Sequence, residues 1–530
     1  MGRLAGMGNA ARRVRWWAAG DVGAFFGLVL DNVTNLVLLA GILVGAFGFP
    51  EEIIARRMIP GTALGVLVGD VVYTILAIRL ARRTGRDDVT AMPLGLDTPS
   101  TIGMAFAVIG PVYAASGSAE AAWQVGAATL VMMGVVKVIL SFAGDLVRRI
   151  VPDAGLLGSL GGVGIALLGF LPLVEMFRLP VVGMVSLGII VYTLVAGMRL
   201  PGRLPGAFAA IAAGTIVYYA MAGAGLLGEA FRAPSIHAAF SPPLPTLAWL
   251  QGLPGAVAYL PIAVPFGLLT IVGGINVTQS ARLAGDEYRA RDILLTEAAA
   301  TLVAGLFGGV AQSTPYIGHP AYKAMGARAA YTLATGLFIG IGGALGIVSF
   351  LVDAIPVAAM VPILVFIGLE VVSQACRACP QGHMPAVGLA FLPSVAYLVL
   401  IYFDRFAGAV SGIAARVAEA APAAAGLVAL PPDLAEAHGI VRVLGHGFIV
   451  TAMIWGGATA LLIDRKAGAA GIYLAVAAIL SLFGVIHSVS PSGAITLPWS
   501  SGSAVPVTIA AGYAITALAL AGLRLASRGR

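Results

Sequence analysis

The sequence predicts an all-α polytopic membrane protein whose spans form two inverted repeats of about seven spans each, followed by about two extra C-terminal spans. Three observations predict this class. The 530 residues are 59% hydrophobic and 10% charged, and the mean hydropathy of +0.97 excludes a soluble domain. The apolar stretches divide into two similar halves, and each half carries a polar break rich in Pro and Gly at a comparable place.

The first residues, 1–21, predict an uncleaved cytoplasmic tail. Arg12, Arg13 and Arg15 come shortly before Trp16 and Trp17, and tryptophans at such a place favour the membrane interface. The apolar stretch that follows is too long for the core of a signal peptide, and no small-residue cleavage site follows it.

About sixteen hydrophobic spans can be drawn, several of them shorter than the usual ~20 residues. Their approximate limits are 22–46, 58–80, 90–114, 121–143, 154–172, 180–198, 204–223, 256–280, 292–309, 313–326, 329–351, 357–375, 384–402, 446–463, 468–488 and 504–523. With the N-terminus inside, roughly 23 of the 31 Lys and Arg residues are cytoplasmic and about 7 are outside, while Lys137 lies within a span. This bias predicts a multi-pass protein of the cell (inner) membrane with both termini cytoplasmic.

The spans predict two repeats of opposite orientation. Seven spans in residues 22–223 are followed by seven in residues 256–463, and because seven is odd, the second set enters the membrane from the other side. Residues 224–255 join the repeats outside the cytoplasm, and residues 404–445 form a second external loop, in which a short interfacial helix is expected around residues 410–421. Residues 464–530 hold the extra spans and a short cytoplasmic tail. This organisation is typical of the seven-plus-seven inverted-repeat transporter fold.

One polar segment interrupts the third span of each half, at residues 91–100 in the first half and at residues 312–320 in the second. We call these two segments the cassettes. A backbone N–H or C=O without a partner costs several kcal/mol in hydrocarbon, so broken segments at membrane depth survive only where they line a cavity. Paired breaks of this kind indicate the binding site of an inverted-repeat transporter. We therefore expect spans 3 and 10 to contain short strand and half-helix elements around a substrate.

Each cassette predicts a short extended piece followed by a half-helix. In the first cassette, the half-helix would begin near Asp97, Thr98 or Ser100, which are all capable N-caps. In the second cassette, Gly318 and His319 precede a proline at a first helical position. Two helix N-termini would then face each other, which favours an anionic or carbonyl-rich ligand.

Several motifs around these breaks carry a family resemblance. They are Met92-Pro-Leu-Gly-Leu-Asp97, Leu294-Leu-Thr-Glu-Ala-Ala-Ala-Thr301, Gly305, Gly308, Thr314-Pro-Tyr-Ile317 and Gly326-Ala-Arg328. Together they resemble the xanthine, uracil and nucleobase–ascorbate permease family, and most closely its hypoxanthine–guanine–adenine branch. The resemblance covers most of residues 21–400. It implies core and gate domains, and a permease for a nucleobase such as xanthine, uracil or hypoxanthine.

The chain departs from that family at two carboxylates, one in the eighth span and one after the tenth-span strand. Those places hold Asn276, or Val272 in the hypoxanthine-branch register, and Gly318 followed by His319. In the family these carboxylates clamp ring N–H groups and take part in proton coupling. Their loss leaves an alternative open: an anion transporter of the same fold, for sulfate, bicarbonate or a carboxylate.

The remaining polar residues inside the spans are expected to carry recognition and coupling, because a charge there costs at least ~2.5–3.5 kcal/mol unless it faces a cavity or a partner. Asp31, Asn35 and Asp97 are predicted to couple transport to H⁺ or Na⁺. The predicted substrate-binding residues are Gly95, Asp97, Thr98, Asn276, Gln279, Thr314, Tyr316, Gly318 and His319. The structural alternatives are a hydrogen-bonding cluster at Asp31 and Asn35, an N-cap at Asp97 and a turn-satisfied His319.

No cofactor, metal or enzymatic activity is expected. Cys376, Cys379 and His383 supply only three potential ligands, and structural zinc takes four. No cytoplasmic segment is large enough for an ATPase or carries a phosphate loop, so energy would come from an ion or substrate gradient. The expected partners are a small-molecule substrate, a coupling ion and the lipid bilayer, with no nucleic acid, and a homodimer is left open.

Overall fold

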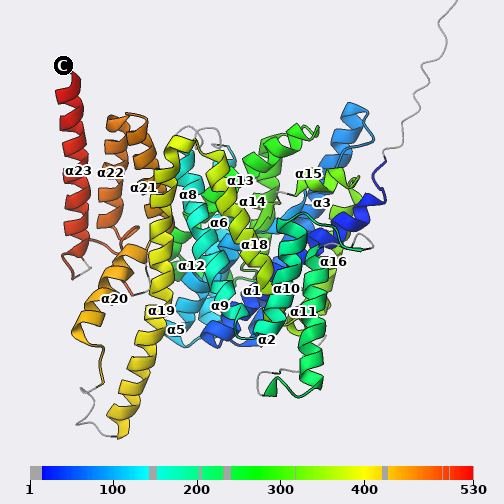
Figure 1. The fold of residues 1–530 in the computed structure, drawn as a ribbon, viewed down its shortest axis with the longest axis horizontal. Helices are drawn as coiled ribbons and strands as arrows, with labels where there is room; N and C mark the ends of the chain where they lie inside the picture. The colour runs from blue at the N-terminus through cyan, green and yellow to red at the C-terminus, as the bar shows by residue number, and fades with distance from the viewer. Residues whose placement is uncertain are drawn as a thin grey trace, which may run out of the picture.

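The computed structural model describes residues 15–142, 152–201, 204, 206–228, 231, 240–316, 318–420, 428–491, 493, 495–499 and 502–528. In these residues the helices stand side by side as a slab, with α22 and α23 at one end (Figure 1). Ten of the helices in the described residues are long and apolar enough to cross a membrane, or up to twelve if each of two bent pairs counts as one span.

The elements of the first half follow the predicted spans closely. They are α1 (Gly20–Phe47), α2 (Glu51–Ile53), η1 (Ile54–Met58), α3 (Ile59–Thr84), β1 (Leu94–Leu96), α4 (Thr98–Met104), η2 (Ala105–Ile109), α5 (Gly110–Ser116), α6 (Ala119–Ser141), α8 (Asp153–Val163), η3 (Gly164–Phe170), α9 (Leu171–Met176), α10 (Pro180–Ile190), η4 (Val191–Val195) and α11 (Gly206–Gly223). Glycines end the long helices where the chain must turn: Gly48 after α1 and Gly85 after α3 have φ values of 65° and 69°, which side chains with a Cβ rarely adopt.

The second half continues in the same manner. Its elements are α12 (Ala248–Ala256), η7 (Val257–Tyr259), α13 (Leu260–Leu283), α14 (Ala290–Leu306), β2 (Ser313–Pro315), α15 (His319–Ala324), α16 (Ala330–Ala344), α17 (Ile347–Ala354), α18 (Val357–Ala378), η8 (Gln381–His383), α19 (Met384–Ala420), α20 (Pro432–Gly445), α21 (Phe448–Ile463), α22 (Ala467–Leu482) and α23 (Val505–Arg528). The helices α16 and α17 bend by 87° at their junction, and α20 and α21 bend by 68°.

One segment differs from its predicted conformation. Residues 404–420, predicted as a loop with a short interfacial helix around residues 410–421, continue α19 without a break, and residues 432–445 form α20. The sequence around Asp404 and Arg405 is polar enough to end an apolar span. It is still rich in Ala, a strong helix former, so nothing ends the helix itself.

The helices pack as two groups. In the first group, α3 packs on α14 and α16, α6 packs on α12, α13 and α14, and α1 packs on α16. In the second group, α8 packs on α18, α19 and α21, and α10 packs on α11 and α18. The helix α22 joins the second group through α21 and also packs on α23. This division separates a group that holds both cassettes from a group that holds neither.

The two cassettes meet in the first group. Strands β1 and β2 pair antiparallel, with Leu94 opposite Pro315, Gly95 opposite Thr314 and Leu96 opposite Ser313. The helix α4 starts directly after β1, and α15 starts shortly after β2. The prediction of strand and half-helix elements in both broken spans is therefore confirmed.

Candidate functional site

Two asparagines of α1 hold β1 in place. The backbone N–H of Leu96 donates to Asn32 Oδ1 over 3.2 Å, and Asn35 Nδ2 donates to the carbonyl oxygen of Leu96 over 3.3 Å. Asn35 also donates to the carbonyl oxygen of Asp31 over 3.0 Å. The short strand has few hydrogen bonds of its own, so these side chains satisfy backbone groups that would otherwise be buried unpaired. Asn35 thus makes the hydrogen bonds that its structural alternative requires, and its coupling role stays a prediction.

Asp97 caps the half-helix α4. Its Oδ2 accepts from the backbone N–H of Ser100 over 2.9 Å, as an N-cap carboxylate does. The same oxygen lies 3.3 Å from the side-chain nitrogen of Gln312, in the second cassette. The predicted N-cap is confirmed, and the structure adds a contact between the two halves of the chain. Thr98, at the first position of α4, is buried beside it.

Asp31 lies against the first strand. A Cβ on Gly95 would stand 2.7 Å from Asp31 Oδ2, so the strand can approach the carboxyl group this closely only with glycine there. Asp31 Oδ2 is buried and has no hydrogen-bond partner among the described residues. A buried carboxylate oxygen without a partner costs free energy, which a proton or a bound ligand would recover.

A buried ion pair between Lys137 and Glu297 contacts β2. Lys137 Nζ, from α6, is 3.6 Å from Glu297 Oε1, on α14, and both side chains are fully buried. The ammonium group donates to the carbonyl oxygen of Ser313 over 2.7 Å and to Thr301 Oγ1 over 3.2 Å. Thr314 Oγ1 donates to Glu297 Oε2 over 3.4 Å.

Neither residue of this ion pair is among the site residues predicted from the sequence. The sequence does contain a signal for the pair, because a lysine and a glutamate lie inside separate apolar spans. Burying either charge without the other would cost free energy. Asp70, on α3, is another fully buried carboxyl group of this region.

Tyr316 and Gly318 complete the second cassette. The rings of Tyr316 and Tyr322 stack with their centroids 6.2 Å apart. A Cβ on Gly318 would stand 2.6 Å from Tyr316 Cε1, so the glycine makes room for this ring. The tyrosine is also next to the first cassette, because its Cβ lies 3.8 Å from where a Cβ on Gly95 would be. The structure therefore gathers Gly95, Asp97, Thr98, Thr314, Tyr316 and Gly318 around the strand pair.

Three predicted residues are placed differently or are not described. Gln279 is exposed near the end of α13. The side chain of Asn276 lies outside the described residues. His319 contacts a different carboxyl group: its Nε2 lies 3.3 Å from Asp286 Oδ2 and 3.3 Å from the carbonyl oxygen of Thr90.

His319 thus belongs to a second polar cluster, centred on Asp286 in the turn between α13 and α14. Lys323 Nζ lies 2.7 Å from Asp286 Oδ1, and Arg86 Nη2 lies 3.3 Å from the same oxygen. Burial alone would raise the pKa of Asp286, but hydrogen bonds from His319, Lys323 and the backbone N–H of Thr90 outweigh it and hold that pKa below its ordinary value.

The neighbouring carboxyl group belongs to the same cluster. A hydrogen bond from Arg86 is the main reason why the pKa of Asp88 falls to about 2. Lys323 Nζ also lies 3.6 Å from Asp88 Oδ2. These contacts tie the loop after α3 and the turn after α13 to the half-helix α15.

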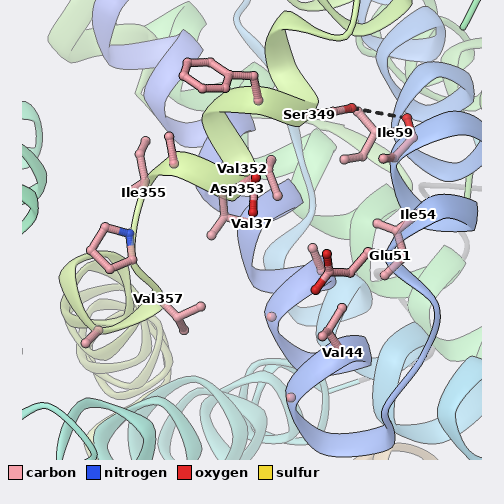
Figure 2. Close-up of a pocket in the computed structure, with 18 of the residues that line it drawn as sticks. Val37, Val44, Glu51, Ile54, Ile59, Ser349, Val352, Asp353, Ile355 and Val357 are labelled. Atoms are coloured by element: carbon pink, nitrogen blue, oxygen red, sulfur yellow. Dashed lines mark hydrogen bonds between the residues drawn. The ribbon is translucent and has the colours of Figure 1, made fainter. Parts of the chain in front are cut away.

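A cavity of 730 Å³ lies at the boundary of the two helix groups. Figure 2 shows Val37, Val44 and Glu51 on one side of it and Val352, Asp353, Ile355 and Val357 on the other. Ser349, at its edge, donates to the carbonyl oxygen of Ala55 over 3.2 Å (Figure 2). On the α1 side, the lining begins at Val37, two residues beyond Asn35.

No family model matches the chain, and no curated protein matches it in sequence. Solved structures do match its fold. The transmembrane domain of the cyanobacterial bicarbonate transporter BicA superposes with a TM-score of 0.51 at 16% identity, over 72% of this chain and 96% of that domain. SLC26A9 superposes with a TM-score of 0.51 at 11% identity, over 73% of this chain and 66% of that protein. The chain therefore has the seven-plus-seven inverted-repeat transporter fold.

These structural neighbours correct the family expected from the sequence. The resemblance to the xanthine, uracil and nucleobase–ascorbate permeases is wrong, because the matching structures are a bicarbonate transporter and SLC26A9. Many residues of the motifs that carried the resemblance belong to the strand pair or are close-packed glycines. Gly305, for instance, packs against the backbone of Val131 and Ala127. Such residues serve the packing and pairing of the backbone in this chain and do not report the substrate.

Proposed function

We propose that this protein is a secondary transporter that carries a small anion across the cell membrane by alternating access, and that bicarbonate is the first substrate to test. The observation that carries this proposal is the pairing of β1 with β2, which brings polar groups of both halves to one place at two half-helix starts. The fold shared with the bicarbonate transporter BicA supports the anion class. No catalytic role is proposed for any residue.

The binding site would lie at the strand pair, between Asp31 of α1 and the start of α4. The first turn of a half-helix supplies backbone N–H donors, and an anion is favoured at such an end. Thr98 and Thr314 add hydroxyl groups next to the strands. Gly95 lets β1 approach the carboxyl group of Asp31 closely.

Two carboxyl groups at this site set a condition on anion binding. Asp97 caps α4, and Asp31 approaches β1 within contact distance of Gly95. An anion next to two ionised carboxylates would be repelled, so it would bind only when a proton or another cation neutralises one of them. We therefore propose that anion transport is coupled to cation entry, with Asp31 and Asp97 as the exchangeable sites.

The movement would occur between the two helix groups. The cassettes belong to the first group, and the cavity of Figure 2 is lined by residues of α1, from this group, and by residues of α11 and α18, from the second. In transporters built from inverted repeats, one bundle rocks against the other around a fixed site. The cavity is then one of the two approaches to the site.

The test uses the purified full-length chain in sealed liposomes. Labelled bicarbonate, sulfate and a small carboxylate are each offered with and without an inward proton gradient. Sulfate and the carboxylate run in parallel because bicarbonate also converts to CO₂, which crosses lipid unaided. We expect saturable, gradient-stimulated uptake of at least one anion. Absence of uptake for all three by folded protein would contradict the anion assignment.

A further inference from the structure

The ammonium group of Lys137 occupies a cradle of oxygen atoms. Lys137 is fully buried, and its Nζ lies 2.7 Å from the carbonyl oxygen of Ser313, 3.2 Å from Thr301 Oγ1 and 3.6 Å from Glu297 Oε1. The side-chain oxygen of the same serine, Ser313 Oγ, is buried and has no hydrogen-bond partner among the described residues. The cradle comes from α14 and β2, while the lysine reaches it from α6.

This set of oxygens has the chemistry of a site for a hard metal cation. Such cations take carboxylate, hydroxyl and backbone carbonyl oxygens. Broken segments of inverted-repeat transporters present unwound carbonyl groups to Na⁺ for this reason. The carbonyl group of Ser313 is such a group, because β2 is the broken segment of its span.

We propose that Lys137 is a resident cation that fills the place a coupling Na⁺ would take, so that the transport cycle runs without Na⁺. The inference rests on the proposed transport function only where the rate of anion uptake is measured. Ser313 lies opposite Leu96 in the strand pair, and Leu96 precedes Asp97. A fixed positive charge here would support the strands permanently and leave protons at Asp31 and Asp97 as the exchangeable charge.

The first experiment compares wild-type protein in NaCl and in choline chloride. The melting temperature of the purified protein and the initial rate of anion uptake into liposomes are both measured. We expect neither quantity to differ between the two salts. A Na⁺-dependent rise of either one in the wild-type protein would overturn the proposal.

The second experiment compares two variants of Lys137. Lys137→Ala removes the ammonium group and leaves a space lined by Glu297 and the cradle oxygens, which Na⁺ can enter. Lys137→Met keeps most of the side-chain volume, so it removes the charge and fills the space. We expect Na⁺ to raise the melting temperature of the alanine variant and to stimulate its uptake by roughly 5- to 150-fold, the usual range of coupling between two sites. The methionine variant should show neither effect.

The outcomes distinguish a failure of the resident-cation role of Lys137 from a failure of the proposed anion substrate class. Equal melting temperatures of Lys137→Ala in Na⁺ and choline would overturn the resident-cation role even if anion uptake is observed. Na⁺ stabilisation without uptake of any anion would support the role of Lys137 and count against the proposed substrate class. If the alanine variant unfolds during purification, its recovery decides the question: folded protein obtained only in Na⁺ supports the proposal, and equal loss in both salts overturns it.

Discussion

Asp97 and Gln312 hold each other by two hydrogen bonds across the boundary between the repeats. The backbone N–H of Asp97 donates to the carbonyl oxygen of Gln312 over 2.9 Å, and the side-chain amide of Gln312 donates to Asp97 Oδ2 over 3.3 Å. Asp97 Oδ2 also caps α4. A change of charge at this carboxyl group therefore acts on the start of one half-helix and on the second cassette together.

Replacing Asp97 by Asn is expected to abolish gradient-driven accumulation of substrate. Asparagine caps a helix about as well as aspartate, so the fold should be retained, but the side chain can no longer take up or release a proton. Concentrative uptake into liposomes under a proton gradient is the measurement, with thermal unfolding as the control for folding.

A second substitution at Asp97 separates its two roles. Asp97→Ala removes the cap as well as the charge and should cost a further ~0.5–2 kcal/mol of stability. Full concentrative uptake by the Asn variant would remove Asp97 from the coupling mechanism and leave it as an N-cap.

Adding a methyl group at Gly95 is expected to disrupt the site without a change of charge. The new Cβ would stand 2.7 Å from Asp31 Oδ2, so either the carboxyl group or β1 must move. Overpacking of this kind typically costs 1–3 kcal/mol, and we expect Gly95→Ala to lower the uptake rate roughly tenfold or more. Gly188→Ala, in α10, is the matched control, because an added Cβ there meets nothing within 4 Å. Equal uptake rates for the two variants would place the substrate away from β1.

The Asp286 cluster is expected to make the protein sensitive to acid. The pKa of Asp286 is held below its ordinary value by His319, Lys323 and Thr90, despite burial. A carboxyl group with a depressed pKa stabilises the fold above the unfolded-state pKa of about 3.9, and this stability is lost as the pH falls through the lower, folded-state value.

Asp286→Asn tests this dependence. The melting temperature of the wild-type protein should fall more steeply than that of the variant between about pH 5 and pH 3. At neutral pH the variant should be the less stable protein, because Lys323 and Arg86 lose their buried partner. Parallel melting curves across this pH range would show that the cluster does not contribute to the acid response.

The fold was predictable from the sequence because the membrane restricts it strongly. Apolar length sets each span, and Gly and Pro mark the breaks, so the positions of β1 and β2 follow from the composition of residues 91–100 and 312–320. The limit of this approach is visible at α19, where the helix continues beyond the apolar span to Ala420. Hydropathy reports which residues suit lipid, and it does not report where a helix ends.

The site was only partly predictable, because a single sequence does not report which distant residues meet. Asp97 could be selected from its own cassette, as a capable N-cap two residues after a glycine. The contact between Lys137 and Glu297 joins α6 to α14, and no local spacing indicates it. His319 follows the second break as expected, but the direction of its ring depends on Asp286 and Thr90, which belong to other turns.

The last prediction concerns alternating access at the two cassettes. Single cysteines replacing Thr98 and Thr314 would lie at the start of α4 and within β2. Both native cysteines, Cys376 and Cys379, are first changed to Ser. Because the first helix group must move against the second, each introduced thiol should react with a membrane-impermeant reagent from one side at a time, and substrate should shift the balance between the sides. Thr129→Cys, at a fully buried position of α6, is the unreactive control. Equal labelling from both sides under all conditions would indicate a channel, and no labelling from either side would place the cassettes in packed protein away from any pathway.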